Sequence, residues 1–373
     1  MKSEEIRLDI APGISRRALL KNGGALVAGS LLASCGQEPA AISPTVVTAE
    51  SSQGPLEFNF RGGHGNANFF RAAAYVAEGM RSSYPPDTLF KIVLGSSYGE
   101  NLESLRSGQV EFATLVPPAC ARWAMDGIGL FDEPFPSLRI VAVFPSMEWI
   151  TVAVSPKLGI RSLEELAEKK PRMRFGTGPL DGHDGMTFLG EEILRHYGVT
   201  FDDIRSWGGE IVGGHVRQLI RRASSAAAMD TYVDMFIQEA KLTQRIGEMP
   251  ENERWTLLPL SESVVVTLEA ELYLKPVILE PGQRTGVSEP YQTVDLSDYL
   301  LATRADVPEQ ATYLAAKSAV ENRHGFESGY THLPVERSNL TYPMVPTEMW
   351  KNTAGVPLHQ GAERYYREAG LMA

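Results

Sequence analysis

Two stretches of the sequence combine glycine, small polar residues and the expected start of a helix, a pattern that suits anion binding. Residues 65–69 and residues 182–187 each lead directly into an amphipathic helical pattern. The first amide groups of a helix have no partner within it, and the helix dipole adds positive potential at the same end. Main-chain amides alone can therefore hold a carboxylate. The sequence thus predicts a site for a small organic anion.

Side chains in and near these stretches add hydrogen bonds, charge and apolar walls. Asparagine and serine can donate hydrogen bonds, and aromatic rings can cover an apolar or planar body. Arg61 is a candidate charge partner for a carboxylate, with a solvent-facing position as the alternative. The expected ligand-binding residues are Arg61, His64, Asn66, Asn68, Phe69, Ser97, Tyr98, Pro117, Trp149, Thr177, His183, Asp184, Asp230 and Tyr232.

Several of these residues have an equally reasonable structural role. His64 either contacts the ligand or bonds to its own loop, and the segment 183–184 either contacts the ligand or caps the helix that follows. Trp149 lies where the chain is expected to cross between two lobes, so it either stacks on the ligand or packs in the hinge. For the segment 230–232 we favour a ligand contact or a contact between lobes.

Catalytic and metal chemistry are not expected. The sequence has no Gly-x-Ser-x-Gly, phosphate-binding or dinucleotide-binding glycine motif in its proper context. His64, His183 and His215 do not show the close spacing of metal ligands, and Cys120 has no base at a motif spacing. We therefore expect a binding protein that is not an enzyme and needs no cofactor.

Alternating strand and helix patterns would position these loops. In the first half of the chain, strand patterns cover 56–60, 90–94, 110–116, 138–144 and 149–154, and helical patterns cover 70–80, the stretch ending at 105, and the stretch beginning at 117–118. In the second half, strands are predicted at 174–178, 225–229 and 294–303, and helices at 186–197, 211–223, 231–242, 308–322 and 361–369. This alternation is typical of parallel sheets covered by helices on both faces.

The pattern begins anew at residue 174, which indicates an α/β fold with two lobes and a hinge cleft. The chain is expected to cross near 149–154 and to return near 293–303. Lobe 1 is predicted to comprise residues 55–148 and 297–373, and lobe 2 residues 149–296. Ligands of open α/β sheets lie beyond the carboxyl ends of the strands, so the loops there should face the cleft.

The first residues read as an export signal. Arg16 and Arg17 precede a short apolar run, 25–33, which is too short to span a bilayer. The run ends at Cys35 in a sequence that resembles the bacterial lipoprotein box, in which the cysteine is lipidated; a plain signal with cleavage nearby is the alternative. We expect residues 1–34 to be the signal, residues 35–54 a flexible tether, and the rest an extracytoplasmic, membrane-anchored protein.

Charge and cysteine content narrow the function further. The chain has 35 basic and 46 acidic residues, a formal net charge of −11. The first 34 residues hold five basic and three acidic residues, so the remainder carries −13. Such a balance argues against nucleic-acid binding, which needs a basic surface. With Cys35 lipidated, Cys120 has no cysteine partner, and no disulfide is expected.

Five segments in the same order resemble the TAXI family of substrate-binding proteins that serve TRAP transporters. These segments are 100–111, 159–166, 197–204, 299–308 and 357–366, the last reading Pro-Leu-His-Gln-Gly-Ala-Glu-Arg-Tyr-Tyr. The resemblance covers residue 56 to the end of the chain. It implies a type II-like periplasmic-binding-protein fold and a TRAP permease as partner.

Two loops depart from that family's pattern. Residues 61–70 replace a Thr/Gly-rich loop, and residues 176–185 carry Leu, Asp and His where the family tends to have Gly, Ser and Thr. The ligand therefore need not be one that is typical of the family. The alternatives are a binding protein for an ABC importer or a sensor kinase, and a lipoprotein enzyme on the same fold.

Overall fold

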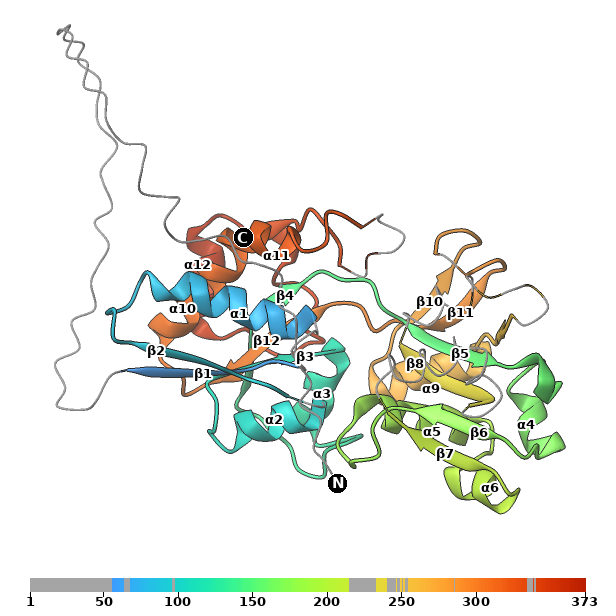
Figure 1. Ribbon diagram of the computed structural model, residues 1–373. Helices are drawn as coiled ribbons and strands as arrows, with labels where there is room; N and C mark the ends of the chain where they lie inside the picture. The colour runs from blue at the N-terminus through green and yellow to red at the C-terminus, as the bar shows by residue number, and fades with distance from the viewer. Residues whose placement is uncertain are drawn as a thin grey trace, which may run out of the picture. The chain divides into compact units, whose positions relative to one another are not determined.

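The protein is described by a computed structural model, in which residues 56–63, 68–95, 98–214, 233–239, 254–284, 286–333, 338 and 340–373 are placed, together with residues 246, 249 and 251. All of these residues lie in one compact unit, residues 46–373. Two five-stranded sheets and a two-stranded hairpin form its framework (Figure 1).

The first sheet has the strand order β2-β1-β3-β12-β4. Its strands are β1 (Glu57–Arg61), β2 (Leu89–Val93), β3 (Phe112–Leu115), β4 (Leu138–Phe144) and β12 (Tyr299–Arg304). Strands β1, β2 and β3 run parallel, whereas β12 runs antiparallel to both β3 and β4. Its helices are α1 (Asn68–Arg81), α2 (Tyr98–Arg106), α3 (Pro118–Asp126), α10 (Glu309–Glu321), α11 (Arg323–Glu327) and α12 (Gln360–Glu368). In Figure 1, α1 and α10 lie on one face of this sheet and α2 and α3 on the other.

The second sheet repeats this plan, with the order β7-β6-β8-β5-β9. Its strands are β5 (Ile150–Val154), β6 (Arg174–Thr177), β7 (Glu210–Gly213), β8 (Met235–Glu239) and β9 (Thr256–Leu257). Strand β6 is parallel to β7 and β8, and β5 is antiparallel to β8 and β9. Each sheet therefore contains one antiparallel strand, β12 or β5, formed where the chain has just crossed from the other sheet.

The remaining elements cover the second sheet and form the hairpin. The helices are α4 (Glu164–Lys169), α5 (Gly185–His196), α6 (Phe201–Ser206) and α9 (Glu262–Leu272), with short 3₁₀ turns at Pro156–Leu158 and Pro346–Glu348. The hairpin pairs β10 (Pro276–Leu279) with β11 (Tyr291–Val294). Among the helices placed in the structure, none combines the length and the apolar character needed to cross a membrane.

The predicted α/β class is confirmed, but three predicted elements are wrong. Residues 211–213 form strand β7 where a helix was predicted, and residues 235–239 form strand β8 where a helix was predicted over 231–242. The residues Met235, Phe236 and Ile237 are all buried, because β8 is a central strand. A strand that is buried on both faces shows no alternation, so periodicity cannot separate it from a buried helix.

The third error is the single strand predicted over 294–303, which is broken into β11 and β12 by residues 295–298. Asp298 has a positive φ of 77° in this break, which turns the chain between the two sheets. The strand predicted at 225–229 lies outside the described residues. Of the helix predicted over 211–223, residues 215–223 also lie outside them.

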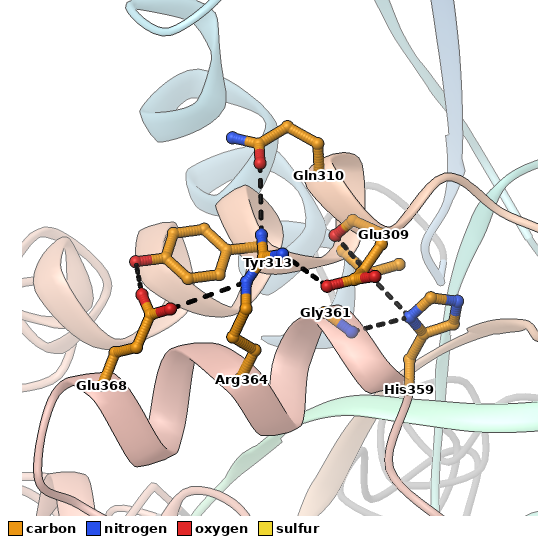
Figure 2. Close-up of polar contacts among 8 residues, drawn as sticks. Glu309, Gln310, Tyr313, His359, Gly361, Arg364 and Glu368 are labelled. Carbon is orange, nitrogen blue, oxygen red and sulfur yellow. Dashed lines mark hydrogen bonds and ion pairs between the residues drawn. The ribbon is translucent and has the colours of Figure 1, made fainter. Parts of the chain in front are cut away.

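The C-terminal helix α12 is fastened to α10 by the most specific of the sequence motifs (Figure 2). His359 caps α12: its Nδ1 accepts a hydrogen bond from the Gly361 amide at 3.2 Å and lies 2.7 Å from the Thr312 hydroxyl of α10. Burial lowers the pKa of His359, which keeps the ring neutral and Nδ1 able to accept. Arg364 pairs with Glu309 and lies over the ring of Tyr313 at 4.7 Å. The motif therefore holds the first sheet's helices together.

Candidate functional site

Two crossing segments, residues 145–149 and 295–298, join the sheets and are bonded to each other. The Ser146 amide donates to Oδ1 of Asp298 at 2.9 Å, and the Asp298 amide donates to the Ser146 hydroxyl at 2.8 Å. The Leu296 amide donates to the Glu148 carbonyl at 3.0 Å. Burial raises the pKa of the Asp298 carboxyl, which also accepts from Asn352 at 2.8 Å. These paired crossings are short and tightly defined, as expected of a hinge.

A small cavity lies beside the crossings, at the carboxyl ends of the parallel strands of the first sheet. It is lined by Asn68, Phe69, Tyr98, Val116, Pro117, Glu148, Leu296 and Tyr299. These residues come from the starts of α1, α2 and α3 and from both crossings. The cavity measures about 20 Å³, which is room for about one water molecule. A larger guest therefore requires the walls to move apart.

Buried hydroxyl and amide groups form one wall of this cavity. The side-chain amide of Asn68 donates to the Tyr299 hydroxyl at 3.1 Å, and the Tyr330 hydroxyl donates to the amide oxygen of Asn68. Burial raises the pKa of Tyr299 well above 10, and the nearby carboxylate of Glu148 raises it further. Tyr299 thus stays protonated and keeps its hydrogen-bonding capacity.

The cavity's other boundary is a direct contact between the start of α2 and the start of α5. The Gly99 amide donates to the His183 carbonyl at 3.1 Å. A Cβ atom added at Gly185 would lie 2.2 Å from the Tyr98 ring, so the bare backbone of α5 rests on that ring. Because α2 belongs to the first sheet and α5 to the second, this contact closes the space between them.

The start of α5 is already occupied by the protein's own carboxylate. Oδ1 of Asp184, which is 6% exposed, accepts hydrogen bonds from the amides of Met186 and Thr187, both at 2.9 Å. The cap interpretation of Asp184 is thus what the structure shows. These amides are not available to a second anion, so an anion seat at this helix is not part of the described geometry. By contrast, α1 has no acidic residue in its first turn.

We expect Asp184→Ala to lower the free energy of unfolding by about 1 kcal/mol, the usual cost of losing an N-cap. Asp184→Asn should preserve most of this stability, because its amide oxygen can still accept from Met186 and Thr187. Urea unfolding of the two variants measures the difference. Equal losses for alanine and asparagine would show that the cap is not what stabilises this end of α5.

Four of the fourteen expected ligand-binding residues line the cavity: Asn68, Phe69, Tyr98 and Pro117. Five others lie outside the described residues: His64, Asn66, Ser97, Asp230 and Tyr232. Cys35, the predicted lipidation site, is also outside them.

The structure gives three further residues other contacts and does not bring them to the cavity. Arg61 pairs with Glu100 and donates to the Ser104 hydroxyl at 2.9 Å. Trp149 packs with Leu279, Val287 and Tyr291 beneath the hairpin, and Arg284 lies over its ring. Thr177 is fully buried and donates to the Met186 carbonyl. Trp149 therefore serves as hinge packing, the alternative that the sequence left open.

The remaining predicted residue, His183, reaches the site only through its backbone. Its side chain is exposed, whereas its carbonyl accepts from Gly99. Sequence reasoning also missed two polar residues that line the cavity, Glu148 and Tyr299, and Tyr330, which bonds to the lining residue Asn68. Glu148 directly precedes the first predicted crossing and Tyr299 lies within the second, and a search for polar residues at those points would have found them. Tyr330 carries no such signal, because only the tertiary fold brings it to Asn68.

A second contact between the sheets lies at α3. The Trp123 indole donates to the Leu272 carbonyl at the end of α9 at 2.7 Å, and its ring meets Phe188 of α5 edge-on at 5.5 Å. A second cavity, of about 330 Å³, adjoins this contact, and Pro117 lines both cavities. The interface between the sheets is therefore closed at both α2 and α3.

Similar solved structures share a low level of identity with this chain. XAC2383 from Xanthomonas citri, bound to ATP, is 10% identical over 83% of this chain and 98% of its own, with a TM-score of 0.46. The alkanesulfonate-binding protein SsuA from Xanthomonas axonopodis pv. citri is 12% identical over 86% and 95%, with a TM-score of 0.39. The periplasmic binding protein BugD is 9% identical over 85% and 98%, with a TM-score of 0.44.

Because these TM-scores are all below 0.5, the assignment rests on the family comparison instead. The model of the NMT1-like family matches residues 85–370, which contain most of both sheets, both crossings and the α12 motif. The chain therefore belongs to the NMT1-like family.

Proposed function

We propose that the chain is an extracytoplasmic solute-binding protein that captures a small molecule between two lobes and delivers it to a membrane permease. The observation that carries the proposal is the cavity at the strand ends of the first sheet, shut by the contact of Tyr98 and Gly99 with residues 183–185 of the second sheet. Because the two walls belong to separate sheets, the cavity can open when the sheets move apart and close when they meet, as capture and release require.

The proposed motion is a rotation of two lobes about the paired crossings. Lobe 1 would comprise residues 55–148 and 297–373, and lobe 2 residues 149–296. With the walls in contact the cavity holds only about 20 Å³, so ligand entry requires the Tyr98–Gly185 contact to open. A ligand that bonds to both lobes only when they close shifts the equilibrium towards the closed state.

For the ligand we propose a small organic anion whose carboxylate lies at the start of α1. The hydrogen-bonding groups at this point are the Asn68 amide, which donates to the Tyr299 hydroxyl, and the hydroxyls of Tyr98 and Tyr299; a ligand carboxylate would take the place of internal partners of these groups. The first turn of α1 contains no acidic side chain. The Asp184 carboxylate, which caps α5, makes the second sheet's side of the contact acidic, so the anionic end is placed towards α1.

As partner we propose a TRAP permease, on the basis of the five sequence segments that resemble TAXI-family proteins. The export signal and lipidation at Cys35 would keep the protein next to that permease on the outer side of the membrane. Genes for permease subunits beside this one would support the pairing. Importer ATPase or kinase genes in that position would favour the alternatives instead.

Binding can be tested by thermal unfolding with a panel of small carboxylates and matched amines and neutral compounds. A ligand at 100 times its Kd should stabilise the protein by about 2.7 kcal/mol. Tyr299→Phe should weaken binding of the best carboxylate about fivefold, the worth of about one hydrogen bond.

The matched control is Tyr366→Phe. The Tyr366 hydroxyl is likewise buried and bonds to the carbonyls of Val141 and Met349, away from the cavity. Both variants should lose similar stability, and only Tyr299→Phe should lose affinity. Stabilisation by amines or neutral compounds, with none by carboxylates, would refute the anionic ligand. Equal affinity losses in the two variants would refute the site.

A further inference from the structure

The second cavity is large enough to hold a small molecule. It lies between elements that pack on the first sheet and elements that pack on the second. Its volume is about 330 Å³, at the lower end of the range of ligand sites. One wall is the start of α3 with residues 351–355, on the side of the first sheet. The other wall is the end of α9 with Lys275, and the crossing at Asp295 and Ser297 closes the cavity between them.

Its walls are held in place by contacts that do not depend on an occupant. The Arg122 guanidinium lies over the Tyr273 ring at 5.1 Å, and the Tyr273 hydroxyl donates to Asp126 at 3.0 Å. Asn352 is bonded to Asp298 at 2.8 Å in the hinge. Both sides of the cavity are therefore preformed, which lowers the entropic cost of binding.

The charged side chains of the lining balance each other. Lys275 and Lys351 supply two positive charges, and Glu269 and Asp295 supply two negative charges. Lys351 also pairs with Glu348, and Asp295 accepts from the Ser297 amide. Within the described part of the chain, no hydrogen bond or ion pair engages the side chains of Lys275 and Glu269. A lone carboxylate or a lone amine would meet like charges here, whereas a molecule with both groups can satisfy both signs.

We propose that this cavity is a second binding site, for a small zwitterion of the amino-acid class. Its carboxylate pairs with Lys275 and Lys351, and its ammonium group pairs with Glu269 and Asp295. Because the occupant contacts both walls across the hinge, it favours the state in which the sheets are in contact. This regulatory site is separate from the proposed ligand cavity, and Pro117 forms the partition between the two.

The test is calorimetric titration of the full exported chain with the twenty common L-amino acids, each beside its matched acid and amine. For L-leucine these are 4-methylpentanoate and isoamylamine. We expect at least one amino acid to bind at least about tenfold more tightly than its acid and its amine, because each analogue lacks one of the two charged groups and with it both contacts of that group. Lys275→Met and Glu269→Gln should each weaken that binding by about tenfold.

The controls are Lys317→Met, which changes a surface pair with Glu321, and Glu262→Gln at the other end of α9. Both should bind as the unaltered chain does, and so should Tyr299→Phe. The proposal is overturned if no amino acid binds, if the acid or the amine binds equally well, or if the cavity variants bind normally. Loss of amino-acid binding in Tyr299→Phe alone would place the molecule in the ligand cavity, which overturns the second site and supports the proposed function.

Discussion

Replacing Gly361 with alanine is expected to lower the free energy of unfolding by about 3 kcal/mol, through overpacking between α12 and α10. A Cβ atom at this position would lie 2.0 Å from the Glu309 carbonyl oxygen and 2.3 Å from the Thr312 hydroxyl (Figure 2). The nearer obstacle is main chain and cannot rotate away, so α12 itself must move and strain its cap at His359. Urea unfolding measures the loss.

Gly329→Ala is the matched control for this variant. A Cβ atom at Gly329 would find its nearest neighbours at 3.5 and 3.7 Å, which is ordinary contact distance. It should therefore change stability by about 0.5 kcal/mol or less. Similar losses for the two variants would mean that the close approach of α12 to α10 is not what demands glycine at residue 361.

Gly185→Ala is expected to weaken ligand binding by about tenfold to a hundredfold, because it blocks closure. The added methyl group would lie 2.2 Å from a ring atom of Tyr98, which is only 8% exposed and cannot swing aside without moving its neighbours. An overpacking cost of about 1–3 kcal/mol falls on the closed state alone, since the two groups belong to different sheets. Titration with the best carboxylate of the panel measures the change.

A double variant that combines Gly185→Ala with Tyr98→Ala removes the ring that obstructs closure. If closure is what fails in Gly185→Ala, that substitution should weaken binding much less in the Tyr98→Ala background than in the unaltered chain. Unfolding by urea should differ little between Gly185→Ala and the unaltered chain, because alanine is well tolerated in the first turn of a helix. A large loss of stability, or an equal loss of affinity from Gly185→Ala in both backgrounds, would contradict this explanation.

The predictable part of the fold is the part that local pattern determines. Amphipathic spacing predicted α1 and α5, and buried apolar runs with turn residues predicted β4 and β5. The helix predicted over 231–242 failed because consecutive residues of β8 are buried, which leaves no sequence period to separate a strand from a helix. In the break between β11 and β12, Asp298 has a positive φ. Aspartate tolerates this conformation but does not require it, so the residue type alone does not predict the break.

The candidate site was predictable only where strand ends supply it. The loops after β1, β2 and β3 converge because parallel strands end at one edge, and Asn68, Tyr98 and Pro117 follow from that rule. The sequence left two roles open for Asp184, a ligand contact and a helix cap. The hydrogen bond from the Met186 amide to Asp184 shows the cap, which no sequence pattern could distinguish from the ligand contact. The α12 motif was the most specific signal for a family, yet its residues fasten helices and do not line the cavity.

Disulfide trapping tests the central claim, that the lobes close on a ligand at the contact between α2 and α5. A Cβ atom on Gly99 would lie 2.9 Å from the His183 carbonyl oxygen and 3.2 Å from the His183 Cβ. A shift of about half an ångström relieves this close approach and gives the Cβ separation of about 3.5–4.5 Å found in disulfides. The variant Gly99→Cys with His183→Cys should cross-link in the closed state, and Cys120 is too buried to interfere.

With the best carboxylate of the panel present, cross-linking should be faster, and the oxidised protein should retain that ligand through dialysis until it is reduced. Cross-linking at the same rate with and without the ligand, together with release of the ligand from the oxidised protein, would contradict capture by lobe closure.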